Sequence, residues 1–67
     1  MAIWRDARGV VVAEVAQGVA QGPQGLRAVY YAIADGQAIP KERFKCASDQ
    51  IARWLQVNRI SATMQMV

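Results

Sequence analysis

The sequence predicts an all-α protein, a small three-to-four-helix domain with a C-terminal helix-turn-helix. Three apolar stripes with helical spacing, separated by breaks that contain glycine or proline, carry this prediction. The 67 residues are enough for one domain, and a chain of this length buries only about 60% of the surface that its unfolded form exposes. We therefore expect a single, marginally stable domain over residues 1–67, for which self-association would add stability.

The first stripe predicts an N-terminal helix over residues 1–22, used for packing or for dimerisation. Asp6 can cap this helix, and Gly22-Pro23 stops it. Its apolar residues follow the i, i+3, i+4, i+7 spacing of one helix face: Val12, Val15, Ala16 and Val19. The run Val10-Val11-Val12 is equally compatible with the start of a strand, so this alternative stays open.

Two further stripes predict the remaining helices. The second consists of Leu26, Val29, Tyr30 and Ile33. Asp35-Gly36 follows it as a C-terminal stop, and Pro40 suits the first turn of the next helix. The third consists of Phe44, Ala47, Ile51, Trp54 and Leu55. This third stripe allows one helix from Pro40 to Asn58, or a turn followed by a helix that begins near Ser48.

The last eight residues, Ile60 to Val67, fit two structures. Apolar and polar residues alternate there, as in a strand, with Ile60, Ala62, Met64 and Met66 on one side. Asn58, however, is a good helix N-cap. The alternation favours an extended tail, whereas the residues that precede it favour a helix.

The segment from Ile51 to Thr63 has the pattern of a helix-turn-helix core. Ile51 and Leu55 would face inward from the first helix, and Val57 would fill the turn. Asn58 would then cap a second helix, which in this motif lies in the DNA major groove. We therefore expect residues 24–66 to form a helix-turn-helix unit that reads DNA with residues 58–66.

The match extends upstream, through Ile33-Ala34-Asp35-Gly36 and Pro40-Lys41-Glu42-Arg43-Phe44. Together these segments resemble the N-terminal part of GntR-type winged-helix regulators. In that family the loop after the glycine places a hydrophobic residue, here Phe44, under the helical core. The resemblance implies a minimal DNA-binding unit without wing or effector domain, of the kind that a phage or plasmid would carry. The excess apolar surface of the first helix suggests pairing with a second copy, so we expect a dimeric transcription regulator.

The distribution of charge favours the same function. The net charge is +3, and the whole excess lies from Lys41 onward, which indicates an end that faces a polyanion. The predicted phosphate contacts are Lys41, Arg43, Lys45 and Arg53. The predicted contacts of the reading face, to bases or phosphates, are Asn58, Arg59, Ser61 and Thr63.

Catalysis is not expected. The chain contains no histidine, a single cysteine and five carboxylates, and none of these has the spacing of a metal cage or an acid/base pair. We therefore expect no enzyme, no metal and no cofactor. Cys46 cannot form an internal disulfide and is expected to be a small buried hydrophobe.

The expected compartment is the cytoplasm. The N-terminal residues carry charges where a signal peptide would be apolar, and the unpaired cysteine suits a reducing environment. The longest strongly apolar run, Val10 to Ala13, is far shorter than the roughly 20 residues that span a bilayer. We therefore expect no membrane protein.

A different class of function remains open beside DNA binding. The chain has more apolar surface than one small domain needs, and Tyr31 falls out of phase with the predicted core. An adaptor, inhibitor or assembly subunit would dock this surface on a larger protein, or would add the tail from Ile60 to Met66 to it as a strand. The two hypotheses differ over residues 59–67, which DNA reading requires to be helical and strand addition requires to be extended.

Overall fold

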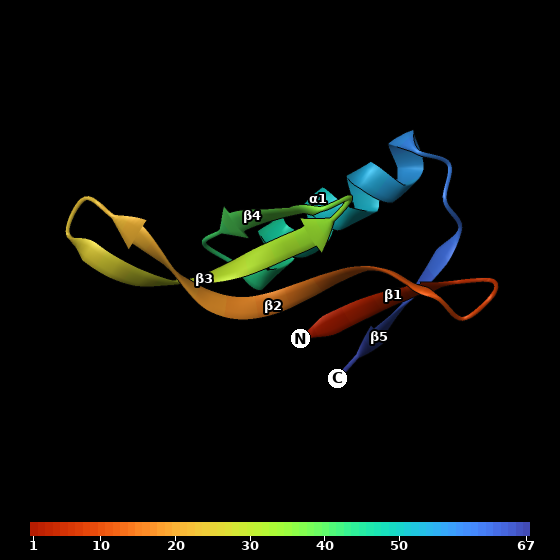
Figure 1. The fold of residues 1–67 in the computed structure, drawn as a ribbon, viewed down its shortest axis with the longest axis horizontal. Helices are drawn as coiled ribbons and strands as arrows, with labels where there is room; N and C mark the ends of the chain where they lie inside the picture. The colour runs from red at the N-terminus through yellow and green to blue at the C-terminus, as the bar shows by residue number, and fades with distance from the viewer.

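A computed structural model describes all 67 residues and is mostly β, with 55% of the residues in strands and 21% in one helix. The elements are β1 (Ala2–Asp6), β2 (Val11–Gly22), β3 (Gly25–Ala34), β4 (Gln37–Lys41), α1 (Phe44–Val57) and β5 (Ala62–Met66). The strands form one antiparallel sheet in the order β4-β3-β2-β1-β5, and α1 packs against one face of it (Figure 1). The prediction of an all-α domain is therefore wrong.

The two helices predicted before Pro40 are strands instead. Residues 1–22, expected as an N-terminal helix, form β1, a turn and β2. The second stripe lies in β3, which pairs with β2 from Ala13↔Ala34 to Gly22↔Gly25. Valine and isoleucine at the stripe positions favour strands, because their branched side chains pack well on a pleated surface and lose rotamer freedom in a helix.

Asp6 caps a turn between strands rather than a helix. Its carboxylate accepts hydrogen bonds from the backbone N–H groups of Arg8 (2.9 Å) and Val10 (3.0 Å), and its side chain forms an ion pair with Arg8. Gly9 completes the turn with a positive φ of 81°. The chemistry predicted for Asp6, a short carboxylate that accepts from nearby backbone amides, is therefore present, but it connects β1 to β2.

The Asp6 turn leads to a prediction about acid stability. The hydrogen bond from the Val10 amide, followed by the contacts with Arg8, holds the pKa of Asp6 below its ordinary value of 3.8 despite some opposing desolvation. A group whose pKa is depressed in the folded state stabilises the fold at pH values above its pKa in the unfolded state. This contribution disappears as the pH falls through its pKa in the folded state. In thermal denaturation from about pH 6 to about pH 2.5, the melting temperature of wild type should exceed that of Asp6→Asn above about pH 4. The difference between the two melting temperatures should disappear at lower pH. A difference that stays constant with pH would contradict this account.

Asp35-Gly36, expected as a helix stop, is the loop of the β3–β4 hairpin. Ala34 pairs with Gln37, so the loop has two residues, and both have positive φ angles of 54° and 73°. Two consecutive positive φ angles are typical of a type I′ turn, which matches the twist of the flanking strands. The Gly22–Gly25 segment likewise closes the β2–β3 hairpin, with Pro23-Gln24 as its loop.

The third apolar stripe is helical, as predicted. α1 begins at Phe44, between the two predicted starting points, and buries Ala47, Ile51 and Leu55. These side chains join one core cluster with residues of the covered sheet face: Ala2, Trp4, Ala13, Val15 and Ala32. Tyr30 and Trp54 lie at the margin of this cluster, half-buried, and Tyr30 packs edge-on against Phe44. The core thus lies between α1 and one face of the sheet.

The chain leaves α1 through a turn that excludes a second helix. The N–H of Ile60 donates to the carbonyl of Leu55, and the N–H of Arg59 donates to that of Gln56, which is the Schellman arrangement of a helix C-terminus. Arg59 has a φ of 55°, and the chain then enters β5. The predicted helix-turn-helix, its reading helix over residues 58–66 and the winged-helix resemblance are therefore wrong. The extended alternative for the tail is confirmed.

The left-handed conformation of Arg59 predicts a stabilising substitution. An L-residue there costs about 1 to 2 kcal/mol, whereas glycine costs about 0.5 to 1 kcal/mol in chain entropy. Arg59→Gly should therefore raise the free energy of unfolding by roughly 0.5 to 1 kcal/mol, measured by urea denaturation. Arg59→Val, which removes the same charge but is β-branched, should destabilise the protein. If both variants changed stability in the same direction, the loss of charge would be the cause rather than the backbone.

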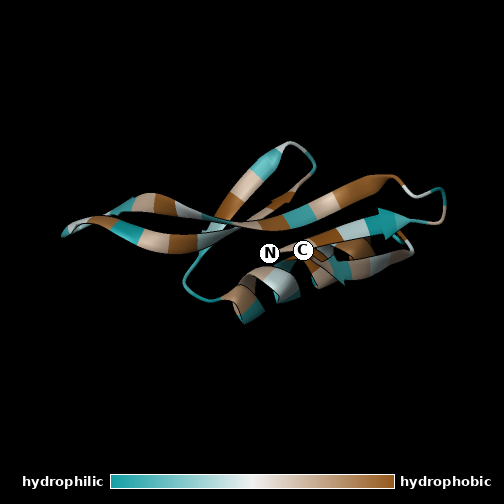
Figure 2. Cartoon of the chain, turned by 90° about the horizontal axis from the view of Figure 1, so that it is seen from below, coloured by the Kyte–Doolittle hydropathy of each residue, from teal (hydrophilic) through white to brown (hydrophobic).

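The molecule is elongated. Its extents are 42 × 24 × 19 Å, and its radius of gyration is 12.3 Å, against about 10.9 Å for a compact domain of this length. Its accessible surface is 4737 Å², about 500 Å² more than a compact monomer of this mass exposes. The long β2–β3 hairpin, which extends well beyond the helix, is the visible source of this shape (Figure 2).

α1 is 14 residues long, and the structure contains no helix with the length and apolar character needed to cross a membrane.

Candidate functional site

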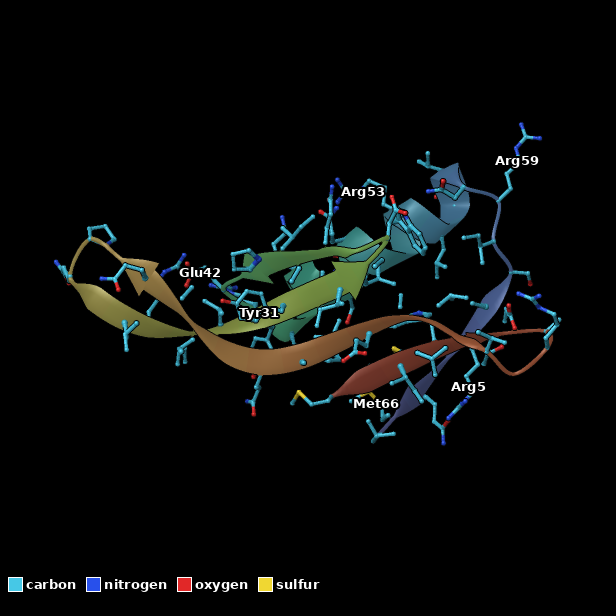
Figure 3. The ribbon with its side chains drawn as sticks, viewed as in Figure 1. Arg5, Tyr31, Glu42, Arg53, Arg59 and Met66 are labelled. Atoms are coloured by element: carbon cyan, nitrogen blue, oxygen red, sulfur yellow. The ribbon has the colours of Figure 1, made fainter.

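The residues predicted to bind DNA do not gather on one reading element. Lys41 ends β4, Arg43 precedes α1, and Lys45 and Arg53 are exposed on α1. Asn58 and Arg59 lie in the turn after α1, Ser61 lies before β5, and Thr63 lies within β5. Arg53 and Arg59 lie at the helix side of the molecule, on α1 and just beyond it (Figure 3). These residues are therefore divided between the helix, two turns and both edges of the sheet.

Several of these side chains have structural contacts. Asn58 donates from its side-chain amide to the carbonyl of Trp54 at 2.8 Å and so caps the C-terminus of α1, rather than the N-terminus of a second helix. Lys45 pairs with Asp49 one turn later at 3.0 Å, and this hydrogen bond raises the pKa of Lys45. Basic residues without an ion pair number five: Arg5, Lys41, Arg43, Arg53 and Arg59.

The β2–β3 hairpin projects as a two-stranded arm, defined here as residues 16–29. β1 pairs with β2 only from Val11 to Val15, and β4 pairs with β3 only from Tyr30 to Ala34. Residues 16–29 consequently have no strand beside them except each other. An isolated two-stranded hairpin is at best marginally stable in water, so contacts at its base matter.

Two contacts hold the base of the arm. The Tyr31 ring lies against Gly18, and its hydroxyl donates to the carbonyl of Val19 at 2.6 Å. Arg27 forms an ion pair with Glu42, which follows β4 (Figure 3). Tyr31, which was expected on a partner surface, is therefore half-buried against the arm. Since Arg27 is the only charged residue among residues 16–29, this ion pair leaves the arm without a free charge.

One face of the arm carries exposed apolar side chains together with two glutamines, Gln17 and Gln21. Cross-strand pairs point to the same side of a sheet, so the pair Val19↔Ala28 and the neighbouring Leu26 continue the face that α1 covers further along. α1 does not reach them, and Val19 and Leu26 are 59% and 72% exposed. The arm therefore presents two uncovered apolar side chains, Val19 and Leu26, beside glutamines on a face that faces solvent.

The two edges of the sheet differ. β4 carries Pro40, which lacks an N–H, and Lys41, and both residue types discourage the addition of another strand. β5 has the sequence Ala-Thr-Met-Gln-Met, without a charge or a proline, and Met64 and Met66 are exposed. The β5 edge is therefore open to strand pairing.

No group of three or more His, Cys, Asp or Glu side chains is placed to hold a metal ion. Cys46 is exposed on α1, so the prediction of a buried cysteine is wrong. The helical phase explains the difference, because the adjacent Ala47 occupies the buried position.

Comparison with protein-family models, with characterised proteins and with solved structures finds no match for this chain.

Proposed function

We propose that this protein is a non-enzymatic protein-interaction module that docks on a larger protein through the arm. The observation that carries the proposal is the exposed pair Val19 and Leu26 on a projecting hairpin without a free charge. Burial of each of these side chains would contribute about 1.5 to 3 kcal/mol to binding. A partner would also order an element that is marginally stable by itself.

The chemistry of the arm indicates the kind of partner. Binding to nucleic acid depends on cations that neutralise phosphates, and the single cation of the arm, Arg27, already pairs with Glu42. Glutamine is the main polar residue of the strands, at Gln17 and Gln21. An apolar groove with neutral hydrogen-bonding groups at its rim, on the surface of a folded protein, would suit this composition.

The test compares the full-length wild type with Val19→Gln/Leu26→Gln. Val10→Gln/Val57→Gln, which removes two exposed apolar side chains outside the arm, is the matched control. Proteins captured from nuclease-treated extract are identified, purified and titrated against each variant, after circular dichroism has confirmed the fold. We expect the arm variant to bind at least about tenfold more weakly, which corresponds to about 1.4 kcal/mol, and the control to bind like wild type. Equal binding by all three proteins would refute the role of the arm.

Duplex DNA is a second candidate partner, supported by the net charge of +3 and by Arg53 and Arg59, which have no ion-pair partner. These residues would attract phosphates without a reading helix in the groove. Affinity for random duplex DNA should then fall steeply between about 50 and 200 mM salt and weaken in Arg53→Ala/Arg59→Ala. Absence of binding at low salt would leave the protein partner as the single proposal.

The proposed module uses no cofactor and acts in the cytoplasm. Cys46 is exposed and unpaired, and a reducing compartment preserves a thiol of this kind.

A further inference from the structure

The backbone of β5 shows which of its groups are free. Met1 and Val67 exchange hydrogen bonds across the β1–β5 ladder, Val67 donating at 2.9 Å and Met1 at 3.4 Å. Hydrogen-bonded and non-hydrogen-bonded pairs alternate along an antiparallel ladder. Residues 63 and 65 therefore bond to β1, as the register Ile3↔Gln65 and Arg5↔Thr63 requires. Ala62, Met64 and Met66 direct their N–H and C=O groups away from β1, toward the open edge.

This edge is complementary to itself. When a second β5 approaches antiparallel, with a two-fold axis at Met64, Met64 lies opposite the partner's Met64. Ala62 then lies opposite the partner's Met66. Each of the three outward-facing residues meets another outward-facing residue, so every free N–H and C=O group of the strand gains a partner. If the register of the two β5 strands shifted by one residue, the free N–H and C=O groups of one strand would lie opposite residues of the other whose backbone groups already bond to β1.

Charge and side chains favour the same arrangement. A chain of net charge +3 repels its own copy, and β5 is a strand without any charged residue. Ala62, Met64 and Met66 share the sheet face on which Trp4 lies, since Trp4 pairs with Met64. Met64 and Met66 are 46% and 58% exposed and flexible enough to pack against their copies. Thr63 and Gln65 would meet on the other face, where they can hydrogen-bond.

We propose that two copies of this chain associate through β5, in the Met64-centred register, to form one continuous antiparallel sheet. This dimer is independent of the proposed function, because the arm lies on β2 and β3 and β5 pairs only with β1. A five-residue edge forms a smaller interface than the roughly 1,200 Å² at the lower end of stable interfaces, so a weak dimer is expected whose population depends on concentration. The predicted dimer surface on an N-terminal helix is wrong, because residues 1–22 form β1, a turn and β2.

Met64→Pro tests the proposal with little cost to the monomer. Proline removes the N–H that points to the open edge and that has no acceptor within the monomer, and its φ suits a strand edge. Met64→Lys is a second variant, which places like charges opposite each other across the two-fold axis. Met64→Leu is the matched control. Sedimentation equilibrium from about 1 to about 500 μM should show dimers for wild type and Met64→Leu, and monomers for the other two.

Amide hydrogen exchange tests the register. Raising the concentration of wild type should slow exchange at Ala62, Met64 and Met66, whereas Thr63 and Gln65 should be protected at all concentrations. A monomeric wild type at about 500 μM, or a Met64→Lys protein that dimerises like wild type, would overturn the proposal. The arm variant Val19→Gln/Leu26→Gln should dimerise normally, which separates this result from the test of the proposed function.

Discussion

Replacement of Ile51 by alanine is expected to destabilise the protein by about 2 to 5 kcal/mol. Ile51 is 1% exposed and lies in the middle of the apolar stripe by which α1 covers the sheet. The removed methyl groups leave a cavity that the sheet behind them cannot collapse to fill, because its side chains there are mostly alanines. A domain of this length has a total stability of only about 3 to 10 kcal/mol, so the variant should lose a large share of its free energy of unfolding.

Val57→Ala is the matched control for this prediction. Val57 is the last residue of the same helix, and its side chain is 76% exposed. Its truncation should change stability by no more than about 0.5 kcal/mol. Urea denaturation of the two variants at equal concentration would measure the contrast. Similar losses in both would mean that α1 does not pack through the Ile51 side.

Gly18→Ala should destabilise the protein by about 1 to 3 kcal/mol. A Cβ at this position would lie 2.6 Å from Cε2 of Tyr31 and 2.9 Å from its Cδ2, closer than such atoms approach. The ring is held in place by its hydroxyl, which donates to the carbonyl of Val19. The substitution must therefore displace the ring and weaken that hydrogen bond, which loosens the base of the arm.

A double-mutant cycle isolates this contact. In a Tyr31→Ala background the obstacle is absent, so Gly18→Ala should cost much less, and the coupling energy should be about 1 kcal/mol or more. Thermal denaturation gives the stabilities of the four proteins. Additive effects would show that the cost at Gly18 arises from the backbone and not from Tyr31.

The helix was predictable, although its first residue was not, because its apolar stripe has a clear helical period. Ala47, Ile51 and Leu55 recur at helical spacing, and polar residues such as Ser48, Asp49 and Gln50 separate them. For the tail, one of the two open alternatives was correct. Its alternation fits β5, but the neighbouring Asn58 was read as an N-cap when it is a C-cap. Asparagine serves both ends of helices, so only the hydrogen bonds from Asn58, Arg59 and Ile60 decide which end is present.

Helices were predicted in place of β2 and β3 because these strands are apolar on both faces over much of their length. Runs such as Val10-Val11-Val12 and Val29 to Ala34 conceal a two-residue alternation and also satisfy helical spacing. The arm adds to this ambiguity, because Val19 and Leu26 are apolar although they are exposed. The signal that would have decided correctly is Asp35-Gly36 between two apolar runs, a strong local indicator of a hairpin.

The candidate surfaces were less predictable than the elements. The basic residues from Lys41 onward are clustered in the sequence, yet the fold distributes them over β4, α1 and the turn after it. Neither the arm nor the free edge of β5 has a sequence signature of its own, because both depend on which strands end early. β1 and β4 have five residues each, whereas β2 and β3 have twelve and ten.

The pairing of β1 with β5 joins the two ends of the chain, which bears on the expected order of folding. The β1–β2, β2–β3 and β3–β4 connections are tight turns that close quickly, whereas the bond between Met1 and Val67 joins residues 66 positions apart. The entropic cost of bringing these two residues together is smaller once the hairpins and α1 have formed between them. We therefore expect β5 to be the last strand to join the sheet, so the attachment of the strand that carries the open edge depends on the rest of the domain.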